Sequence, residues 1–569
     1  MQTTPSRPPA GTDPHPVREG LEVSVADTRM LNRAPDMPSI PVYRSQILVG
    51  YAFAMAAILL LATSAWSETL DTGGVRIAWA NDALAPQTLE VGGSSSPRSL
   101  ISRMQDGVPV SQHLSILTDD GLVWRSDPEL GPQGQSPAAL VRYLQSPDGE
   151  WLLEQRFQPT GSRYQLRMEL ILTRRAGVAA SGMGVFRVML GPGLGEVPLD
   201  GLGIAAGMYS FVEPVAKMGG DVHRLDPPES GSSRSQVVTP ETPIEWAGLN
   251  SRYFALLLAP ETRVAVRGLV VGESYSPDPA GLPARYLPWI GLDLNLPELG
   301  VGESRKIAFE VFAGPKSKPV LSDPSLAHDY TGLLFPGLWN WMRGIAIALL
   351  SVLGWLHALI PNWGLAICLL AIIVRALLWP VGRWALASQQ RFSDIQKLIQ
   401  PKIREIKARY KGGEQSERIL ALYEKHNISP LAGLKPLLIV LIQIPIFVAM
   451  FHVLGQAWEL RQASFLWIDS LAEPDRLFEF GVELPFFGAW FNLLPVLMAA
   501  TTLATIKLSP APASSAAESR RQNVFLILMA IGFFLLFYPF PAGMVLYWSM
   551  ANILHIAQYW ISGKRTERQ

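Results

Sequence analysis

The chain of 569 residues contains a single cysteine, Cys368, so no disulfide can form within it. Charged residues make up only 17% of the sequence, and the 48 basic and 48 acidic side chains leave no net charge. The net charge therefore gives no indication of nucleic-acid binding. Hydrophobic residues reach 49% and the mean hydropathy is +0.19, which is high for a soluble protein and low for a chain made only of membrane helices. These values predict membrane helices joined to a large soluble domain.

Motifs of enzyme chemistry are missing from the soluble part, residues 67–335. It has no His/Cys spacing typical of zinc, no phosphate-binding P-loop and no nucleophile elbow. His113 and His223 stand alone, and we interpret each as a solvated or packed side chain. We therefore expect no catalytic residue, no metal and no cofactor, and the protein is not expected to be an enzyme.

Long apolar runs, in contrast, recur along the chain. Six of them are predicted spans: Ile47–Ala65, which is long enough to cross a bilayer, Gly364–Val381, Pro436–Gly455, Phe486–Ile506, Val524–Tyr538 and Gly543–Ile561. The first follows a tail rich in Pro, Ser and Arg, which we expect to be disordered. The first run is longer than a usual signal core, so an uncleaved anchor is favoured over a cleaved signal peptide.

Charge asymmetry gives the orientation of these spans. Gly382–Lys435 carries 11 basic and 5 acidic residues, whereas Trp458–Pro485 carries 2 basic and 6 acidic ones. Lys507–Arg521 and the tail after Ile561 each carry 3 basic residues and 1 acidic residue. Basic segments stay in the cytoplasm, so six spans with both termini inside satisfy the pattern. A seventh apolar run, Gly344–Ile360, would break the alternation and is predicted to be an amphipathic helix on the outer surface.

The predicted organisation is an α-helical polytopic membrane protein with a large external β-sandwich. The spans are 47–66, 362–381, 436–456, 486–507, 522–538 and 543–561. Cytoplasmic parts are the tail 1–46, a basic helical hairpin 382–435, the loop 508–521 and the tail 562–569. External parts are the β-sandwich 67–335, the interfacial helix 336–361, the loop 457–485 and the turn 539–542.

Strand patterns identify the external domain as an antiparallel β-sandwich. Several segments alternate apolar and polar residues, and clusters of Gly, Pro, Asp and Ser separate them. The clearest examples are Tyr164–Leu172, Tyr253–Leu258, Thr262–Val271 and Ile307–Phe312.

One charged residue stands inside an apolar run. Arg375 lies within Leu365–Leu378, and a charge at the centre of a membrane helix costs about 2.5–3.5 kcal/mol on insertion scales. Such a residue is usually functional and paired, yet none of the six apolar runs contains Asp or Glu. We therefore expect Arg375 to face a water-filled cavity or to bind a carboxylate on another molecule.

The basic hairpin is predicted from two helical patterns, Trp384–Tyr410 and Ser416–Lys425, joined by Lys411-Gly412-Gly413-Glu414. Its first helix carries an apolar stripe with basic residues on the other faces. The stripe includes Phe392, Ile395 and Leu398, and the basic residues include Lys402, Arg404 and Lys407. Two interpretations stay open: a solvated hairpin that packs on itself, or a docking surface for ribosomes, nascent chains or anionic lipid.

A series of short motifs then resembles a known family. In chain order the motifs are Asn362-Trp363-Gly364, Ile373-Val374-Arg375, Pro380, Leu398-Ile399-Gln400-Pro401-Lys402-Ile403, Asn427-Ile428-Ser429-Pro430-Leu431-Ala432-Gly433, Pro436-Leu437-Leu438-Ile439, Gln443-Ile444-Pro445-Ile446-Phe447, Glu459-Leu460-Arg461-Gln462-Ala463, Phe540-Pro541-Ala542-Gly543 and Leu546-Tyr547. Each motif is weak alone, but their order and spacing resemble the YidC-type membrane protein insertases, which are related to the mitochondrial oxidase-assembly insertase. The external domain looks like the large periplasmic domain of the Gram-negative members, with weaker motifs at Trp246–Phe254 and Phe312–Lys316, and the resemblance therefore implies that residues 67–335 lie in the periplasm of a bacterial inner-membrane protein.

The resemblance implies a five-helix insertase core around a hydrophilic groove, with Arg375 attracting acidic tails of incoming proteins. Polar residues that would keep water in this groove, or instead bond helix to helix, are Gln443, Asn523, Asn552 and Gln558. Residues along which substrate helices would slide, or which simply pack the bundle, are Ile444, Pro445, Phe447, Phe533 and Phe537. Implied partners are nascent membrane proteins, the Sec translocon, the ribosome or signal-recognition machinery, and the lipid bilayer. No sequence-specific nucleic-acid recognition is expected.

The chain departs from the family at three places. Trp384–Gly433 has no methionine, although the hairpins of relatives are often rich in it. Ala371 stands where some relatives have a hydroxyl residue, and Trp548 where some have a second tyrosine. These differences predict a groove that is less polar than in those relatives.

Two other functions remain as alternatives. Arg375 could bind an anion in a secondary transporter or channel, although no paired half-repeats and no buried acidic coupling site are present. The β-sandwich could instead bind glycan in an envelope assembly factor, with the spans serving only as anchors. Solute flux through liposomes would support the transporter, and complete loss of activity on deletion of the β-sandwich would support the glycan factor.

Overall fold

The computed structural model describes residues 68–566 with several gaps. The gaps are 80–85, 87, 92–97, 101–103, 106–107, 110–111, 119–123, 127–138, 147–148, 177–185, 196–210, 228–234, 262–265, 277–284, 295–297, 426–434, 485–486 and 509–515. All described residues belong to one compact unit. The predicted N-terminal tail and first span therefore lie outside the described residues.

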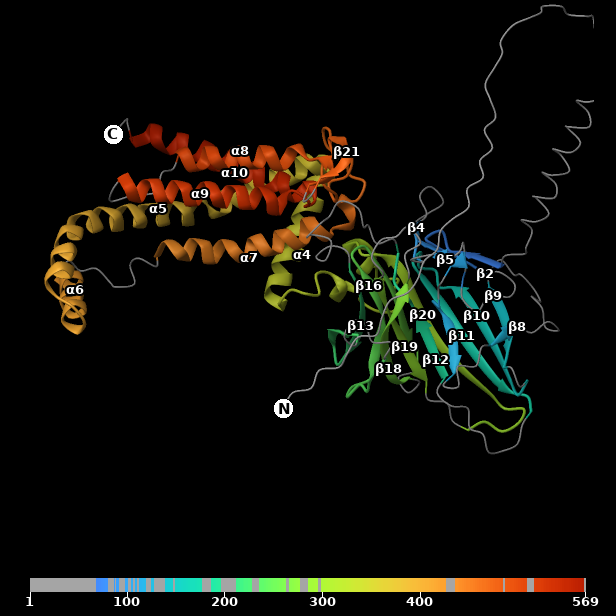
Figure 1. Cartoon of the computed structure of the whole chain (residues 1–569). Coiled ribbons are helices and arrows are strands. Elements are labelled where there is room, and N and C mark those ends of the chain that lie inside the picture. The colour runs from blue at the N-terminus through green and yellow to red at the C-terminus, as the bar shows by residue number, and fades with distance from the viewer. Residues whose placement is uncertain are drawn as a thin grey trace, which may run out of the picture. The chain divides into compact units, whose positions relative to one another are not determined.

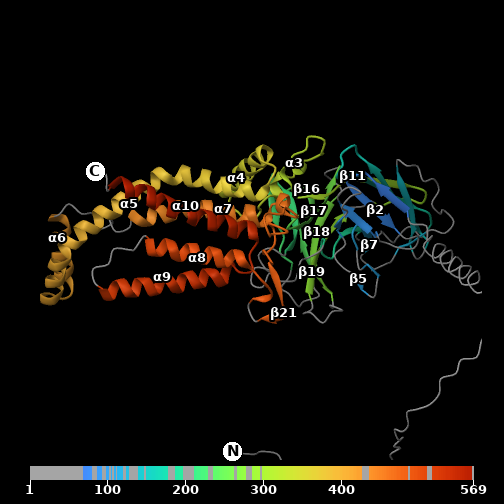
Figure 2. The same ribbon diagram turned by 90° about the horizontal axis from the view of Figure 1, so that it is seen from above.

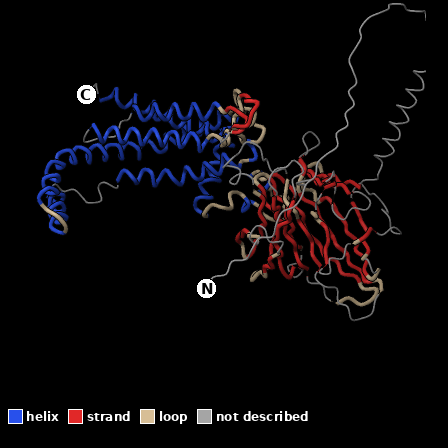
Figure 3. Tube along the Cα trace, viewed as in Figure 1, coloured by secondary structure: helices blue, strands red, loops and turns tan. Residues whose placement is uncertain are grey.

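Strands come first along the chain and helices follow, apart from one hairpin between two helices (Figure 3). Among the described residues, nine strands form a large sheet, and every pairing in it is antiparallel. In spatial order they are β14 (Asp221–Arg224), β13 (Val212–Met218), β16 (Ile244–Ser251), β17 (Phe254–Pro260), β20 (Ser304–Pro315), β11 (Gln165–Arg174), β10 (Trp151–Pro159), β9 (Leu140–Gln145) and β8 (Arg125–Ser126).

A second antiparallel sheet faces part of the first one (Figure 1). Its strands are β15 (Gln236–Val238), β18 (Val266–Ser276), β19 (Arg285–Leu294), β12 (Phe186–Leu190) and β7 (Ser115–Thr118). Strand β19 contacts β13 and β16 of the large sheet. The predicted antiparallel β domain is therefore present, and the four strand segments predicted above fall on β11, β17, β18 and β20.

Alternation of side chains explains how the large sheet encloses its core. Strands β9 and β10 alternate buried and half-buried residues over most of their length, because successive side chains point to opposite faces. Strand β17 is buried at every position, which is typical of a central strand covered on both faces. Large buried side chains such as Trp246, Phe309 and Phe312 fill the interior.

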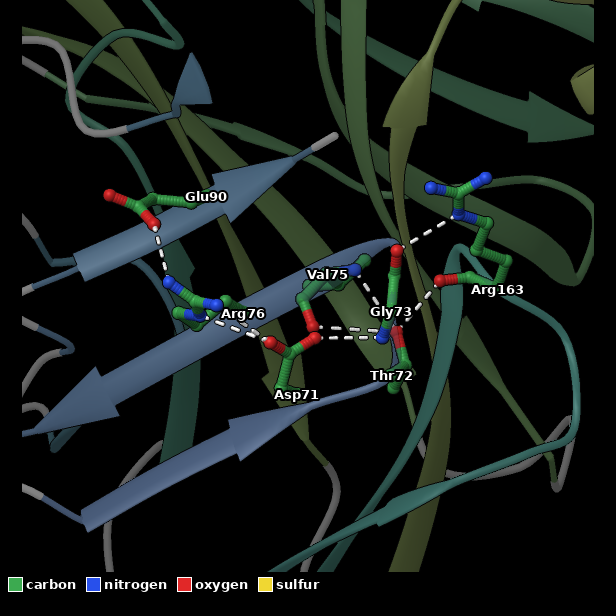
Figure 4. A network of polar contacts seen from close by, with 7 residues as sticks. All are labelled: Asp71, Thr72, Gly73, Val75, Arg76, Glu90 and Arg163. Atoms are coloured by element: carbon green, nitrogen blue, oxygen red, sulfur yellow. Dashed lines mark hydrogen bonds and ion pairs between the residues drawn. The ribbon is translucent and has the colours of Figure 1, made fainter. Parts of the chain in front are cut away.

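A small sheet of β1 (Glu68–Asp71), β2 (Val75–Trp79), β3 (Thr88–Val91) and β4 (Arg98–Ser99) is joined to the large sheet by polar contacts. Figure 4 shows the turn between β1 and β2, where Thr72 Oγ1 donates to the Arg163 carbonyl at 2.7 Å and Arg163 Nε donates to the Gly73 carbonyl at 2.9 Å. Gly73 has φ +79°, a conformation that glycine adopts without strain. The Gly73 N–H and then Arg76 hold the pKa of Asp71 below its usual value.

The helical part begins after β20. Its elements are α3 (Lys318–Leu321), the 3-10 helix η2 (Thr331–Leu333), α4 (Asn340–Leu359), α5 (Trp363–Arg409), α6 (Gly413–Lys425), α7 (Lys435–Gln456), η4 (Trp458–Leu460), the hairpin of β21 (Phe478–Leu484) and β22 (Gly488–Phe491), α8 (Leu493–Leu508), α9 (Ala516–Phe537) and α10 (Ala542–Thr566). A further two-stranded ribbon, β5 (Met104–Gln105) and β6 (Val108–Pro109), lies in the β domain.

The long helices α5, α7, α8, α9 and α10 run side by side (Figures 1 and 2). Helix α10 contacts α5, α7 and α8, and α9 contacts α8. Two boundaries differ from the predictions. Helix α8 starts at Leu493 rather than Phe486, because residues 488–491 pair with β21 as a strand. The predicted second span and the first hairpin helix are one continuous helix, α5, which contains Pro380 and Pro401.

Within the described residues, two helical segments are long and apolar enough to cross a membrane, Asn340–Leu359 and Trp363–Pro380. Shorter apolar helices are Gln443–Gln456, Leu493–Thr505 and Asn523–Phe537. Helix α4, predicted to lie on the outer surface, thus meets the same length and composition test as a span. It carries exposed Trp341 and Trp355, which suits a membrane interface. The predicted count of six spans depends on the charge pattern of the connecting segments and not on this test.

Candidate functional site: an arginine within the helical bundle

Arg375 lies on the side of α5 that faces the other helices. Its neighbours Ala371 and Val374 are buried, whereas Ile373 and Leu377 on the other side of the helix are exposed. Arg375 itself is half-buried. This stripe of small and apolar residues packs α5 against α10, α7 and α4. The guanidinium is therefore held within the helical bundle and not on its outer surface.

The structure gives Arg375 a partner within the same chain. Its Nη2 atom contacts Nδ1 of His555 on α10, while its Nε atom is buried and has no hydrogen-bond partner among the described residues. His555 was not predicted as this partner, because only Asp and Glu were considered as partners for Arg375. The signal was available, because His555 is an ionisable residue inside a predicted span.

The four candidate groove amides are distributed over three helices. Gln443 on α7 and Asn523 on α9 are exposed, and Gln558 on α10 is buried. Asn552 donates from Nδ2 to the hydroxyl oxygen of Thr502 on α8 at 2.8 Å. This bond gives Asn552 the helix-to-helix role that was left open as an alternative.

The candidate slide residues lie around a cluster of aromatic rings. Phe447 packs against Trp548 with ring centres 5.1 Å apart, and Phe533 lies 5.8 Å from the same ring. Phe537 is buried and lies 5.4 Å from Trp548. Ile444 is exposed and Pro445 is half-buried in α7, whose helical pattern continues through the proline. Trp548, one of the departures from the family, is thus a centre of packing between α7, α9 and α10.

The hairpin packs on itself. Ile399 and Ile403 of α5 are buried against Ile419, Leu422 and Tyr423 of α6. The turn contains Gly412 at φ +68°, and the Arg418 guanidinium lies 4.0 Å from the centre of the Tyr410 ring. The three predicted basic docking residues, Lys402, Arg404 and Lys407, are all exposed. The side chains of Phe392, Ile395 and Leu398 lie outside the described part of the chain.

Arg252 of the β domain makes contacts with the helical part that the sequence did not reveal. Its Nε atom donates to the Gly455 carbonyl at the end of α7 at 2.8 Å, and Nη2 donates to the Ala472 carbonyl at 2.9 Å. The side chain is almost completely buried. Beside it, the ring of Phe254 lies 5.1 Å from that of Trp458. This arrangement links β17 to the segment that follows α7.

Lys316 lies close by, at the end of β20. Its Nζ atom donates to the Ser251 carbonyl at 2.9 Å, and the side chain is buried. Burial lowers the pKa of Lys316 to about 8, and the carboxylate of Glu213 acts in the opposite direction. Both residues of this pair, Arg252 and Lys316, come from the segments that resemble motifs of the Gram-negative periplasmic domain.

Comparisons with known proteins agree with the motif series. Residues 355–569 match the model of the family described as 60Kd inner membrane protein. The membrane protein insertase YidC of Chlamydia trachomatis serovar D is 32% identical over 346 residues, which cover 56% of this chain and 43% of that protein. The insertase YidC of Anaeromyxobacter sp. strain K is 28% identical over 469 residues, covering 80% of this chain and 75% of that protein.

One solved structure is described as an active YidC insertase with the first transmembrane domain resolved. The match covers 86% of this chain and 91% of the chain in that structure. Its sequence identity is 18% and its TM-score 0.32. This chain spans less than half of the length of the Chlamydia relative that it matches. The family model and the sequence relatives confirm the resemblance to YidC-type insertases.

Proposed function

We propose that this chain, whose residues 355–569 match the model of the 60Kd inner membrane protein family, is a membrane protein insertase and chaperone. It would insert and help to fold proteins of the inner membrane, alone or beside the Sec translocon. The observation that carries the proposal is Arg375, a cation within the helical bundle whose Nε atom is buried without a hydrogen-bond partner among the described residues. A substrate carboxylate would supply that partner.

In this proposal, six spans cross the membrane and five of them form the insertase core. The core helices would be α5, α7, α8, α9 and α10, which pack together. The positive charge of the hairpin and of the segment Lys507–Arg521 favours a cytoplasmic position for both. The β domain and the acidic segment Trp458–Pro485 would then lie in the periplasm.

The mechanism needs no covalent chemistry. A hydrated groove around Arg375 would shorten the hydrocarbon distance that a polar tail has to cross. Arg375 would attract acidic residues of that tail, and the membrane potential favours their outward transfer by about 2.3 kcal/mol per charge per 100 mV. Transfer of the apolar substrate helix into lipid would then make insertion practically irreversible.

Exposed apolar side chains offer a path for the substrate helix. Ile444 on α7 and Phe525, Leu528 and Ile531 on α9 all expose large apolar surfaces. Such surfaces suit lipid or another apolar helix. The aromatic cluster around Trp548 would give this path a firm wall, because its rings pack against one another.

The hairpin is the proposed docking surface at the cytoplasmic side. Its exposed Lys402, Arg404 and Lys407 form a basic patch on α5. A patch of this kind suits ribosomal RNA, acidic surfaces of the signal-recognition machinery or anionic lipid. The self-packed core of Ile399 and Ile403 would hold the patch in place.

The proposal is tested with a pair of substrates that differ only in tail charge. We expect purified protein in liposomes to insert a single-span protein with two aspartates in its N-terminal tail, and Arg375→Ala to reduce this insertion at least tenfold. Insertion of the same substrate with asparagines at both positions should fall much less in Arg375→Ala. Arg375→Lys, which keeps the charge but not the planar fork, should fall between the two. Equal losses for both tails would contradict a role for Arg375 in attracting acidic tails.

A further inference from the structure

Several arginine side chains of this protein bind carboxylates through the same edge, that of Nε and Nη2. The Nε and Nη2 atoms of Arg187 donate to the two carboxylate oxygens of Asp293. The Nε and Nη2 atoms of Arg418 both donate to Glu414 Oε1, at 3.2 and 3.1 Å. The planar guanidinium presents these two N–H groups in parallel, which matches the spacing of carboxylate oxygens.

At Arg375 the same edge is half occupied. His555 Nδ1 contacts Nη2, and Nε is buried with no hydrogen-bond partner among the described residues. An imidazole nitrogen can accept a bond only when it carries no proton, so His555 is the neutral tautomer with its proton on Nε2. A neutral imidazole offers one acceptor, and it leaves the second donor of this edge unsatisfied.

We propose that His555 is an exchangeable partner of Arg375, which a carboxylate of the incoming chain displaces. This inference rests on the proposed function. His555 holds Nη2 while no substrate is bound, and the carboxylate then takes Nη2 and Nε together. The exchange replaces one bond to a neutral group by two bonds to a charged group, which are stronger.

The geometry favours exchange over a permanent pair. Arg375 and His555 belong to different helices, α5 and α10, and touch only through their side chains, so their exchange breaks no backbone hydrogen bond. None of the six apolar runs carries an Asp or Glu that would compete for the arginine. The buried Nε gains a hydrogen-bond acceptor only when the carboxylate is bound. A buried unpaired donor costs free energy, and the carboxylate recovers this cost.

His555 therefore acts as a competitor that lowers the affinity for acidic tails. Such competition keeps Arg375 hydrogen-bonded between substrates and lets a bound tail leave again. It also predicts selectivity: a tail that offers no carboxylate has no reason to displace His555. Replacing His555 by an apolar residue should raise the affinity for acidic tails. The contribution of the uncharged part of the substrate to the affinity should stay the same.

The test uses the full chain in liposomes, with the variants His555→Leu and His555→Gln. Leucine has no acceptor, whereas the glutamine amide oxygen can accept the same bond. The probes are the single-span protein with two aspartates in its tail and its counterpart with two asparagines. The measurement is the substrate concentration that gives half-maximal site-specific crosslinking to α7, and the quantity compared is the ratio of the two affinities.

We expect His555→Leu to raise the preference for the aspartate tail about tenfold, which corresponds to about 1.4 kcal/mol, and His555→Gln to raise it less. A preference that falls or does not change in His555→Leu would overturn the inference. Equal losses for both tails would show that His555 is only a packing residue and would overturn it as well. If the wild type inserted neither substrate, the proposed function would fail. This outcome differs from failure of the inference, which concerns only the ratio of the affinities for the aspartate and asparagine tails.

Discussion

Removal of the Arg252 guanidinium should loosen the segment that follows α7. Arg252 donates to the Gly455 and Ala472 carbonyls at 2.8 and 2.9 Å, and only 4% of its surface is exposed. A hydrogen bond from a charged donor contributes about 1.5–3 kcal/mol. The variant Arg252→Met keeps most of the apolar stem, so the two lost bonds set the cost at about 3 kcal/mol or more. A difference of this size corresponds to an approximately 100-fold change in a local opening equilibrium.

Hydrogen–deuterium exchange of the full chain in detergent measures this opening. The amides to follow are those of Ala457, bonded to the Val453 carbonyl at 2.9 Å, and Leu471, bonded to the Ala463 carbonyl at 2.9 Å. We expect both to exchange about 100-fold faster in Arg252→Met than in the wild type. Arg305→Met, a substitution of an exposed arginine in the same domain, is the control.

Two results would refute the reasoning about Arg252. Exchange within threefold of the wild type in Arg252→Met would show that the two bonds do not hold the segment. An equal acceleration in Arg305→Met would show that loss of any positive charge from the domain has the same effect. Acceleration confined to the segment between Gly455 and Ala472, whose carbonyls accept the two bonds, would support the account.

Three further predictions concern stability. The pKa of lysine in the unfolded chain is near 10.4, while burial lowers the pKa of Lys316 in the folded protein to about 8. Between these two values the unfolded state binds more protons than the folded state, so the stability of the wild type rises with pH. Lys316→Met carries no burial cost of a charge at any pH, so its free energy of unfolding in urea, relative to that of the wild type, should fall by about 3 kcal/mol between pH 7 and pH 11. A difference that stays constant with pH would contradict the burial cost. Asn552→Leu removes the bond to Thr502 and should lower stability in detergent by about 0.6 kcal/mol, a value typical of such bonds between membrane helices; no loss would mean that the bond adds nothing. Ile403→Ala opens a cavity in the small core shared with Ile399 and should lower the local stability of the hairpin by about 2 kcal/mol. Amide hydrogen exchange across α6 should then be about 30-fold faster. Unchanged exchange would show that this core does not hold the hairpin.

Patterns that repeat along the chain were readable from the sequence. Alternation of apolar and polar residues predicted strands at β11, β17, β18 and β20, since the period of two is set by the strand itself. Apolar runs predicted both ends of α7, the C-terminal end of α9 and the N-terminal end of α10 to within one residue. The isolated charge of Arg375 was recognised because its cost in an apolar run is a local property.

Features that depend on distant pairing were not readable in this way. Arg375 and His555 are 180 positions apart, and only the packing of α5 on α10 brings them together. The start of α8 was displaced because the aromatic segment Phe486–Phe491 has the composition of a span, while pairing with β21 makes part of it a strand. Arg252 likewise carries no local signal of burial, since its acceptors are carbonyls of a segment about 200 residues away.

Helix α5 shows a different limit. Pro380 and Pro401 each remove one backbone hydrogen bond and are expected to kink or end a helix. Helical residues nevertheless continue from Trp363 to Arg409. Packing on both sides, by α10 and α7 along one part and by α6 along the other, outweighs the local preference.

The central claim is that this chain can move the tail of a membrane protein across a bilayer on its own, although it would also act beside the Sec translocon. The most direct measurement adds a short single-span protein with an acidic N-terminal tail to liposomes that contain only the purified chain, and scores the tail that becomes protected from protease. The account predicts protection well above that of empty liposomes, and its loss in Arg375→Ala. Protection no greater than in empty liposomes, with the chain folded and correctly oriented, would contradict it.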